Sequence, residues 1–235
     1  MSTVTISNTS NRGQPDIPPL EAGDRLSRAE FERRYNAMPD LKKAELIEGK
    51  VHMPSPVGYE RHAAPHADLI GWMSVYRSAT PGVRVADNVS IRLDLDNMPQ
   101  PDAAMMIDPR LGGQTQTSAD DYVVGGPELV AEVSSSTVSI DLHAKFQVYR
   151  RNGVQEYLVW RVRDQAIDWF VLHDGEFVRL PAEADGTLRS RVFPGLWLSP
   201  AALLAGDLAT VLQVLQQGLA HESHAEFVRR LQSPR

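Results

Sequence analysis

The chain has 235 residues and a net charge of −6, and its 42% hydrophobic and 23% charged residues are ordinary proportions for a globular protein. The absence of cysteine excludes disulfide bonds, thiolate zinc sites and cysteine nucleophiles, and it favours a reducing cytoplasmic location. No apolar run approaches the roughly 20 residues of a membrane span, and the acidic balance counts against a broad basic face for nucleic acid.

The first 20 residues differ from the rest of the chain. They lack the basic start and apolar core of a secretory signal, and their polar composition predicts a disordered tail over residues 1–20. No repeat or linker interrupts residues 21–235, which are predicted to form a single domain with a C-terminal extension.

The first predicted elements are a short helix and a hairpin. Ser27, with Glu30 three positions later, predicts the start of a helix over residues 26–36. The segment AELIEGKVHMPSP, residues 44–56, predicts two short strands around a turn at Glu48-Gly49, ended by prolines.

Helical and alternating patterns then follow each other. Apolar residues at helical spacing predict a helix over residues 60–77. Alternation from Val89 to Leu95 predicts a strand, which a turn over residues 96–100 joins to a second strand over residues 102–107. The polar, Gly-rich loop 108–126 is long enough to be functional or mobile.

The second half of the chain contains a strand-helix-strand unit. ELVAEVSSS, residues 128–136, predicts a buried strand; a helix over 141–153 and an apolar strand over 154–162 follow. Such a βαβ unit requires two parallel, buried strands. A hairpin with its turn at Asp174-Gly175 and a closing helix from about Pro200 complete an α/β fold with a mixed sheet flanked by helices.

Three polar residues stand at positions that favour burial. Asp102 follows Pro101 at the start of a strand, and Glu132 lies inside an apolar strand. Lys145 shares the inward helix face with Leu142 and Tyr149. A buried carboxylate needs a basic partner, a raised pKa or a bound cation. Two carboxylates on neighbouring strands suit Mg²⁺ or Mn²⁺, and a lysine beside them could hold or deprotonate an attacking water.

Each residue also has a structural interpretation. Asp102 could end a hairpin, because Pro-Asp is common in turns. Lys145 and Asp141 could form a surface ion pair at i, i+4. Glu132 would be exposed if its strand lay at an edge, but apolar neighbours on both faces argue against this. The order and spacing of all three favour one shared site.

Four pieces of the chain, taken together, resemble the Uma-type endonuclease family, a bacterial group within the restriction-endonuclease-like PD-(D/E)xK superfamily. The resemblance runs from about Leu26 to beyond Trp169, and its pieces are AELIEGKVHMPSP, QPDAAMMI, PELVAEVSSST and DLHAKFQVYRRNGVQEYLVW. It implies a restriction-endonuclease-like core that hydrolyses phosphodiester bonds with the help of a metal ion.

The resemblance also implies roles for individual residues. Asp102 and Glu132 would be the two metal-binding acids. The superfamily's usual lysine position, two residues after the second acid, is Ser134 here, and Lys145 on the next helix matches the place to which that lysine has moved. Glu45 matches a further acidic position near the metal site, and Glu48 is the alternative for that role.

Histidine and arginine pairs are weaker candidates. His62 and His66 lie one helical turn apart, but Pro65 interrupts the turn and no third acidic ligand is evident, so partly exposed, structural histidines are favoured. Arg150 and Arg151 close the Lys145 helix and are the preferred phosphate-binding pair.

Two functions remain open at this stage. The first is a cytoplasmic, Mg²⁺- or Mn²⁺-dependent endonuclease with DNA as the expected substrate, acting as a homodimer because cutting two strands with one site per chain favours pairing. The second is an inactive module of the same fold that binds nucleic acid or protein, which the acidic net charge and Ser134 favour.

Overall fold

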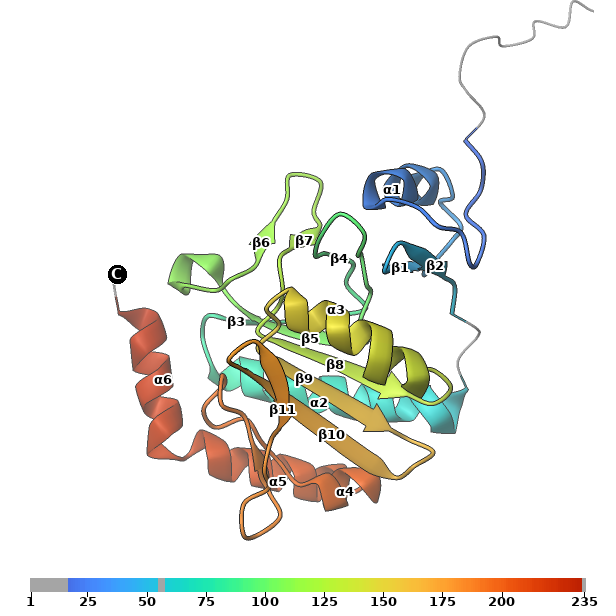
Figure 1. Cartoon of the computed structure of the whole chain (residues 1–235). Coiled ribbons are helices and arrows are strands. Elements are labelled where there is room, and N and C mark those ends of the chain that lie inside the picture. Colours follow the sequence, from blue (N-terminus) through green and yellow to red (C-terminus); the bar gives the residue numbers. More distant parts are fainter. Residues whose placement is uncertain (1–16, 55–57, 234–235) are drawn as a thin grey trace, which may run out of the picture.

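Six strands hydrogen-bond into one mixed sheet at the centre of the computed structural model, which describes residues 17–54 and 58–233 (Figure 1). In chain order these strands are β3 (Val83–Asp87), β5 (Ala103–Ile107), β8 (Leu129–Ser134), β9 (Glu156–Arg161), β10 (Ala166–His173) and β11 (Glu176–Arg179). Their spatial order is β11-β10-β9-β8-β5-β3. Only β8 and β9 run parallel among the neighbouring pairs of this sheet; the other four pairs are antiparallel.

Helices and small sheets surround this sheet. The helices are α1 (Arg28–Asn36), α2 (Ala64–Ala79), α3 (Phe146–Arg151), α4 (Pro200–Leu204), α5 (Leu208–Leu219) and α6 (Glu222–Gln232). Shorter turns are the π-helical η1 (Tyr59–Ala63) and η3 (Ile140–Lys145) and the 3-10 turn η2 (Pro109–Leu111). The small sheets pair β1 (Glu45–Ile47) with β2 (Lys50–His52), β12 (Leu188–Arg189) with β13 (Trp197–Leu198), and β4 (Ile91–Arg92) and β6 (Gln116–Thr117) with β7 (Val123–Val124).

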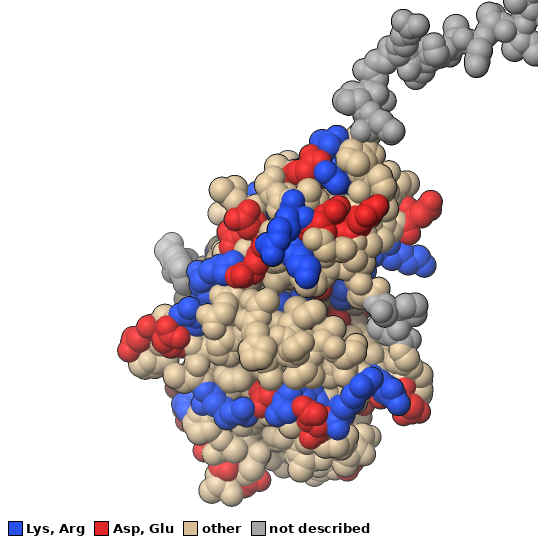
Figure 2. Space-filling view, turned by 45° about the vertical axis from the view of Figure 1, so that its right-hand side comes forward, with Lys and Arg blue, Asp and Glu red and all other residues tan. Residues whose placement is uncertain are grey.

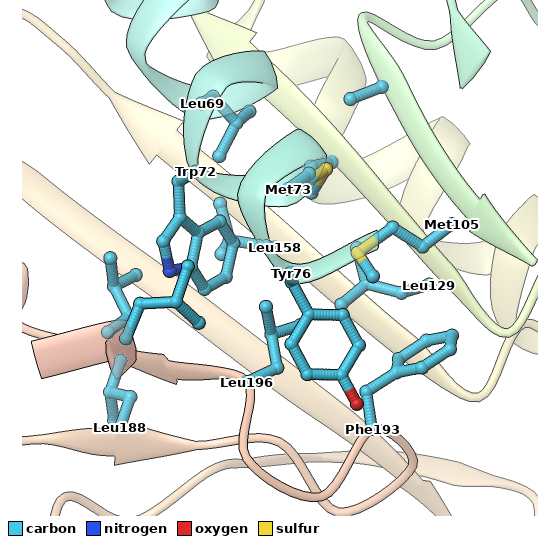
Figure 3. Close-up of a cluster of buried hydrophobic side chains, with 14 of the residues drawn as sticks. Leu69, Trp72, Met73, Tyr76, Met105, Leu129, Leu158, Leu188, Phe193 and Leu196 are labelled. Atoms are coloured by element: carbon cyan, nitrogen blue, oxygen red, sulfur yellow. The ribbon is translucent and has the colours of Figure 1, made fainter. Parts of the chain in front are cut away.

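The two faces of the main sheet are covered differently. Helices α2 and α5 lie on one face and α3 on the other (Figure 1). On the α2 face, Trp72 and Tyr76 pack against Leu129 of β8 and Leu158 of β9 in the largest hydrophobic cluster (Figure 3). Successive strand residues point to opposite faces, so Glu132 of β8 points toward α3 rather than into this cluster.

Several sequence predictions are confirmed. Ser27 caps α1 by accepting a hydrogen bond from Glu30 N–H at 3.4 Å. β1 and β2 form the predicted hairpin, with Glu48 at φ 52° and Gly49 at φ 70° in its turn. Residues 128–162 form the predicted βαβ unit, since β8 and β9 are parallel neighbours with η3 and α3 between them.

Two predictions differ from the structure. The second strand predicted over residues 102–107 is present as β5, but the segment at Val89 to Leu95 is a strand only over Ile91–Arg92, and this strand pairs with β7 outside the main sheet. Leu95, predicted to lie on the apolar side, is 76% exposed. The single closing helix predicted from Pro200 is three helices, because Gly206 and the caps at Asp207 and His221 end and restart the helical path.

The predicted N-terminal tail lies only partly within the described residues. Residues 1–16 of the predicted tail lie outside the described part, and Leu20, at the end of that tail, is buried with Phe31 and Leu46. None of the helices in residues 17–54 and 58–233 combines the length and apolar character that a membrane crossing requires.

The contact between α5 and the 193–197 segment predicts a large difference between two Gly→Ala substitutions. A Cβ on Gly218 would lie 2.2 Å from Gly195 O and 2.8 Å from Trp197 Cγ, whereas a Cβ on Gly71 of α2 would meet nothing within 4 Å. We expect Gly218→Ala to lower the free energy of unfolding by about 1–3 kcal/mol and Gly71→Ala to raise it by about 0.5–1 kcal/mol. Urea denaturation of both variants checks this, and equal stabilities would contradict the packing described.

Candidate active site

A buried ammonium group on the α3 face of the sheet is surrounded by carboxylates. Lys145 Nζ lies 2.8 Å from Glu45 Oε1, 2.9 Å from Glu132 Oε1 and 3.7 Å from Asp141 Oδ1. Tyr149 donates its hydroxyl to the same Glu132 oxygen at 2.9 Å. The lysine comes from η3, Glu132 from β8 and Glu45 from β1, so three separate elements meet at one point.

The electrostatics of this cluster follow from burial and proximity. Burial alone would lower the pKa of Lys145, but the charges of Glu132, Glu45 and Asp141 outweigh it and hold the pKa well above its usual value. Burial raises the pKa of Glu132, and the Lys145 charge opposes this only partly. These contacts favour the charged form of Lys145, and its two predicted roles, holding or deprotonating a water, stay predictions.

Asp102 lies where the ladder between β5 and β8 ends. The register pairs Ala103 with Ala131, and two residues further it would place Pro101, which has no N–H, opposite Val133. Asp102 Oδ2 instead accepts the Val133 N–H at 2.8 Å, and His62 Nδ1 lies 3.1 Å from Val133 O. Pro101 thus ends the pairing of β5 with β8, and the side chains of Asp102 and His62 contact the N–H and the carbonyl of Val133 there.

Two side-chain nitrogens, from a lysine and a histidine, approach the other Asp102 oxygen. Lys43 Nζ lies 3.3 Å and His62 Nε2 3.5 Å from Oδ1. Burial would raise the pKa of Asp102, but His62 and the charge of Lys43 hold it well below the usual range. Asp102 is therefore ionised at neutral pH although only 4% of its surface is exposed.

The two acids predicted to bind metal belong to adjacent strands. Extending the β5-β8 register by one residue places Asp102 opposite Glu132, and directly opposed residues of an antiparallel pair have Cβ atoms about 4.5–5.5 Å apart. In the described residues no three His, Asp or Glu side chains are spaced to hold one ion between them. An ion here would use one or two carboxylates and complete its shell with water, the usual pattern for Mg²⁺.

The charge balance of the cluster fits a cation of this kind. Four buried carboxylates, Glu45, Asp102, Glu132 and Asp141, are in contact with two lysines, Lys43 and Lys145, and one histidine, His62. The acids outnumber the lysines, and a hard divalent cation would favour the ionised forms of Glu132 and Asp141, whose pKa values burial raises. Carboxylate oxygens are also the donors that such a cation prefers.

Glu45 and Glu48 are separated by the geometry. Glu45 contacts Lys145 and accepts the Gln100 N–H at 2.8 Å, so it belongs to the cluster. Glu48 lies in the hairpin turn and forms an exposed ion pair with Arg151. The sequence left this choice open because both glutamates lie in the same five-residue segment.

Ser134 stands at the position where the family resemblance predicts a lysine. Its hydroxyl donates to Asp141 Oδ2, which also accepts from Thr137 Oγ1 at 2.6 Å. Ser134 therefore anchors Asp141, which in turn faces Lys145. The ammonium reaches the second acid from the following π-helical turn instead of from the strand.

The arginine pair predicted to contact phosphates forms ion pairs with other parts of the chain. Arg150 contacts Glu176 at 2.7 Å, and Arg151 contacts Glu48 and Asp94. Both side chains remain partly exposed, at 26% and 42%. Their contact with phosphate stays a prediction, and it would require them to exchange these partners.

Sequence reasoning missed one residue of the site, Lys43, and gave too little weight to two others, Asp141 and His62. Lys43 carries no pattern that separates it from the neighbouring Lys42, although it precedes the Glu45 strand closely. Asp141 was considered only as a partner in a surface ion pair, yet it is 2% exposed. His62 was interpreted as structural for want of an acidic partner, and the structure supplies Asp102 from a distant segment.

Another buried glutamate, Glu156, shows how this chain satisfies a carboxylate outside the cluster. Glu156 accepts hydrogen bonds from Ser190 Oγ at 2.8 Å, Trp169 Nε1 at 3.2 Å, and the N–H groups of Arg191 at 2.6 Å and Val192 at 3.1 Å. Burial raises its pKa to about 7. Neutral donors satisfy Glu156, whereas Glu132 is held by an ammonium and a phenol.

Comparisons with known proteins agree with this fold. The model of a family described as "Uma2: Putative restriction endonuclease" matches residues 28–201. A crystal structure of a "putative nuclease belonging to DUF820" from Anabaena variabilis is 16% identical, with a TM-score of 0.54, and the match covers 74% of this chain and 97% of that one. No curated protein matches the chain.

The buried ion cluster predicts a specific pattern of stability. Lys145→Met leaves the carboxylates of Glu132, Glu45 and Asp141 without their cation, so we expect a loss of about 3–5 kcal/mol in the free energy of unfolding at pH 7. The double variant Lys145→Met/Glu132→Gln removes one of these charges and should be less destabilised than Lys145→Met alone. Urea denaturation at pH 7 measures both, and a Lys145→Met variant as stable as the wild type would refute the cluster.

Proposed function

The chain belongs to the Uma2 family, described as putative restriction endonucleases, and from its buried acidic cluster we propose that it is a metal-dependent endonuclease with DNA as its substrate. The observation that carries this proposal is the convergence of Glu45, Glu132 and Lys145 from three elements, with Asp102 directly before the neighbouring strand β5. A lysine held at 2.8 and 2.9 Å by two glutamates is a preorganised cation.

Asp102 and Glu132 would hold the divalent cation, Mg²⁺ or Mn²⁺. Asp102 is ionised at neutral pH, and among the described residues the only recorded hydrogen-bond contacts of the Glu132 carboxylate are at Oε1. Once bound, such an ion activates water and neutralises charge on a phosphate. Glu45 would support the site by fixing Lys145 rather than by binding the ion itself.

The reaction supported by these residues is hydrolysis of a phosphodiester. The oxygen of a water forms a bond to phosphorus, the bond from phosphorus to the leaving oxygen breaks, and the water's proton passes to the medium while the leaving oxygen gains one. The charged Lys145 would orient the water or stabilise the additional negative charge on the phosphoryl oxygens. It would not accept the water's proton, because a charged ammonium has three N–H donors and no lone pair.

Binding of nucleic acid would depend on local groups. On the face shown in Figure 2, Lys and Arg side chains are interspersed with Asp and Glu rather than gathered into one basic stripe. The net charge of −6 also opposes long-range attraction of a polyanion. We therefore propose modest intrinsic affinity, with Arg150 and Arg151 as auxiliary phosphate contacts, action in the cytoplasm, and a homodimer where both strands are cut.

The inactive-module alternative has one specific observation in its favour. Ser134 replaces the strand lysine, and the substituting Lys145 is only 4% exposed and fully engaged by carboxylates. A lysine so enclosed could serve stability alone. Metal binding and cleavage distinguish the two functions.

We predict that calorimetry detects Mn²⁺ and Mg²⁺ binding to the wild type, and that Glu132→Gln and Asp102→Asn each abolish it because a neutral amide replaces a charged ligand. Plasmid incubated with Mn²⁺ should be nicked by the wild type, and Lys145→Ala should slow nicking by roughly 10²–10³-fold, the usual effect of removing one transition-state donor.

Glu183→Gln is the matched control, since Glu183 is an exposed glutamate remote in sequence from the cluster. It should bind metal and nick like the wild type. Circular dichroism and urea denaturation identify any variant that has simply unfolded. A folded wild type that binds neither ion and nicks nothing would support the inactive module instead.

A further inference from the structure

The ring of His62 contacts two oxygen atoms at the end of the β5-β8 ladder. Its Nδ1 lies 3.1 Å from Val133 O, and its Nε2 lies 3.5 Å from Asp102 Oδ1. The side chain is 19% exposed, so the ring is mostly enclosed but open to solvent on part of its surface. A histidine between a main-chain carbonyl and a carboxylate is well oriented, and the first contact fixes which nitrogen carries a proton.

The carbonyl contact determines the tautomer. A carbonyl oxygen only accepts hydrogen bonds, so Nδ1 must be the donor toward Val133 O. In a neutral imidazole this leaves the lone pair on Nε2, directed at the carboxylate of Asp102. Two electron-pair donors that face each other require either a proton or a cation between them.

The separation of the two donors suits a metal ion. The distance of 3.5 Å between Nε2 and Asp102 Oδ1 is longer than the 2.7–3.2 Å of a normal N–H···O hydrogen bond. Two ligands about 2.1 Å from one ion are about 3.0 Å apart at octahedral and about 3.4 Å apart at tetrahedral angles. The observed separation is close to the second value and needs a small adjustment for the first.

We propose that His62 Nε2 is a nitrogen ligand of the divalent cation held by Asp102, and that the site therefore favours a first-row transition ion such as Mn²⁺ over Mg²⁺. The inference rests on the proposed function, because it takes Asp102 as a metal ligand. It adds a donor type that oxygen-only sites lack: imidazole binds transition ions well, whereas Mg²⁺ prefers oxygen.

The surroundings of His62 match those of metal-binding histidines elsewhere. Such histidines usually donate their other ring N–H to a carboxylate or a backbone carbonyl, which fixes the ring and the tautomer; Val133 O has this role here. His62 also lies in the π-helical turn η1, and Lys145 lies in the second π-helical turn, η3. Turns of this kind occur frequently at functional sites.

The neighbouring His66 does not share these properties. Its Nε2 lies 2.9 Å from Asp102 O and 3.1 Å from Asp87 Oδ1, so both oxygens engage the same nitrogen. Lys43, 3.3 Å from Asp102 Oδ1, reduces the charge of that carboxylate and thereby its attraction for a cation. The neutral imidazole of His62 would add affinity for the cation. The positive charge of Lys43 weakens this contribution less than it weakens that of the Asp102 carboxylate.

The test combines pulsed electron paramagnetic resonance of the Mn²⁺-loaded full chain with calorimetry. The wild type should show ¹⁴N modulation from a coordinated imidazole, which [¹⁵N]histidine labelling replaces with the ¹⁵N pattern. His62→Gln should lose this modulation and weaken Mn²⁺ binding by at least about 10-fold, the lower range for losing even an outer-shell partner. Mg²⁺ binding should weaken less, so the ratio of the two affinities falls.

His66→Gln is the control and should keep both the nitrogen modulation and the wild-type preference for Mn²⁺. Mn²⁺ bound without nitrogen modulation in the wild type, or modulation that persists in folded His62→Gln, would overturn the assignment while leaving a metal-dependent enzyme intact. No binding of either ion would instead reject the proposed function. If His62→Gln fails to fold, the wild-type spectra and a His62→Asn variant decide.

Discussion

The burial of one ammonium group among carboxylates is the constraint on which the site depends. Lys145 can be buried only because Glu132 and Glu45 lie within 2.9 Å of it, and these glutamates can be buried only because the lysine is there. Each partner belongs to a different element, so β8, η3 and the β1-β2 hairpin must all be in place before any of the charges is compensated. The cluster therefore couples local chemistry to the arrangement of the whole domain core.

The end of the β5-β8 ladder provides the second half of the site. Because Pro101 has no N–H to donate, the Val133 carbonyl has no strand partner at the end of the β5-β8 ladder and contacts His62 instead, while the Val133 N–H donates to Asp102 Oδ2. The same proline that ends the pairing therefore lies next to the point where Asp102 and His62 meet the backbone of Val133. Where strand pairing ends inside a protein, the backbone groups that lose their partners are usually paired with side chains or ordered water.

The parts of this arrangement that follow local patterns could be predicted from the sequence. Glu132 stands in an apolar strand and Lys145 on the inward face of the next helix, so strand alternation and helical spacing were enough to bring them together. Lys43 and His62 could not be found in this way. Lys43 is 59 residues from Asp102 in the sequence, and the contact of His62 with Asp102 depends on how the start of the α2 region meets the end of the β5-β8 ladder. The pairing of β4 with β7 was missed for the same reason: alternation shows that a segment is extended but not which strand lies beside it.

The position of Glu45 has a consequence for the integrity of the site. Glu45 comes from the two-stranded β1-β2 sheet, whose residues pack in a separate hydrophobic cluster with Leu20, Phe31 and Met98. If this N-terminal layer undocks while the six-stranded sheet stays folded, Lys145 loses one of its glutamates and is opened to water. The integrity of the acidic cluster is then a property of the docked hairpin, and a local opening can disrupt it without global unfolding.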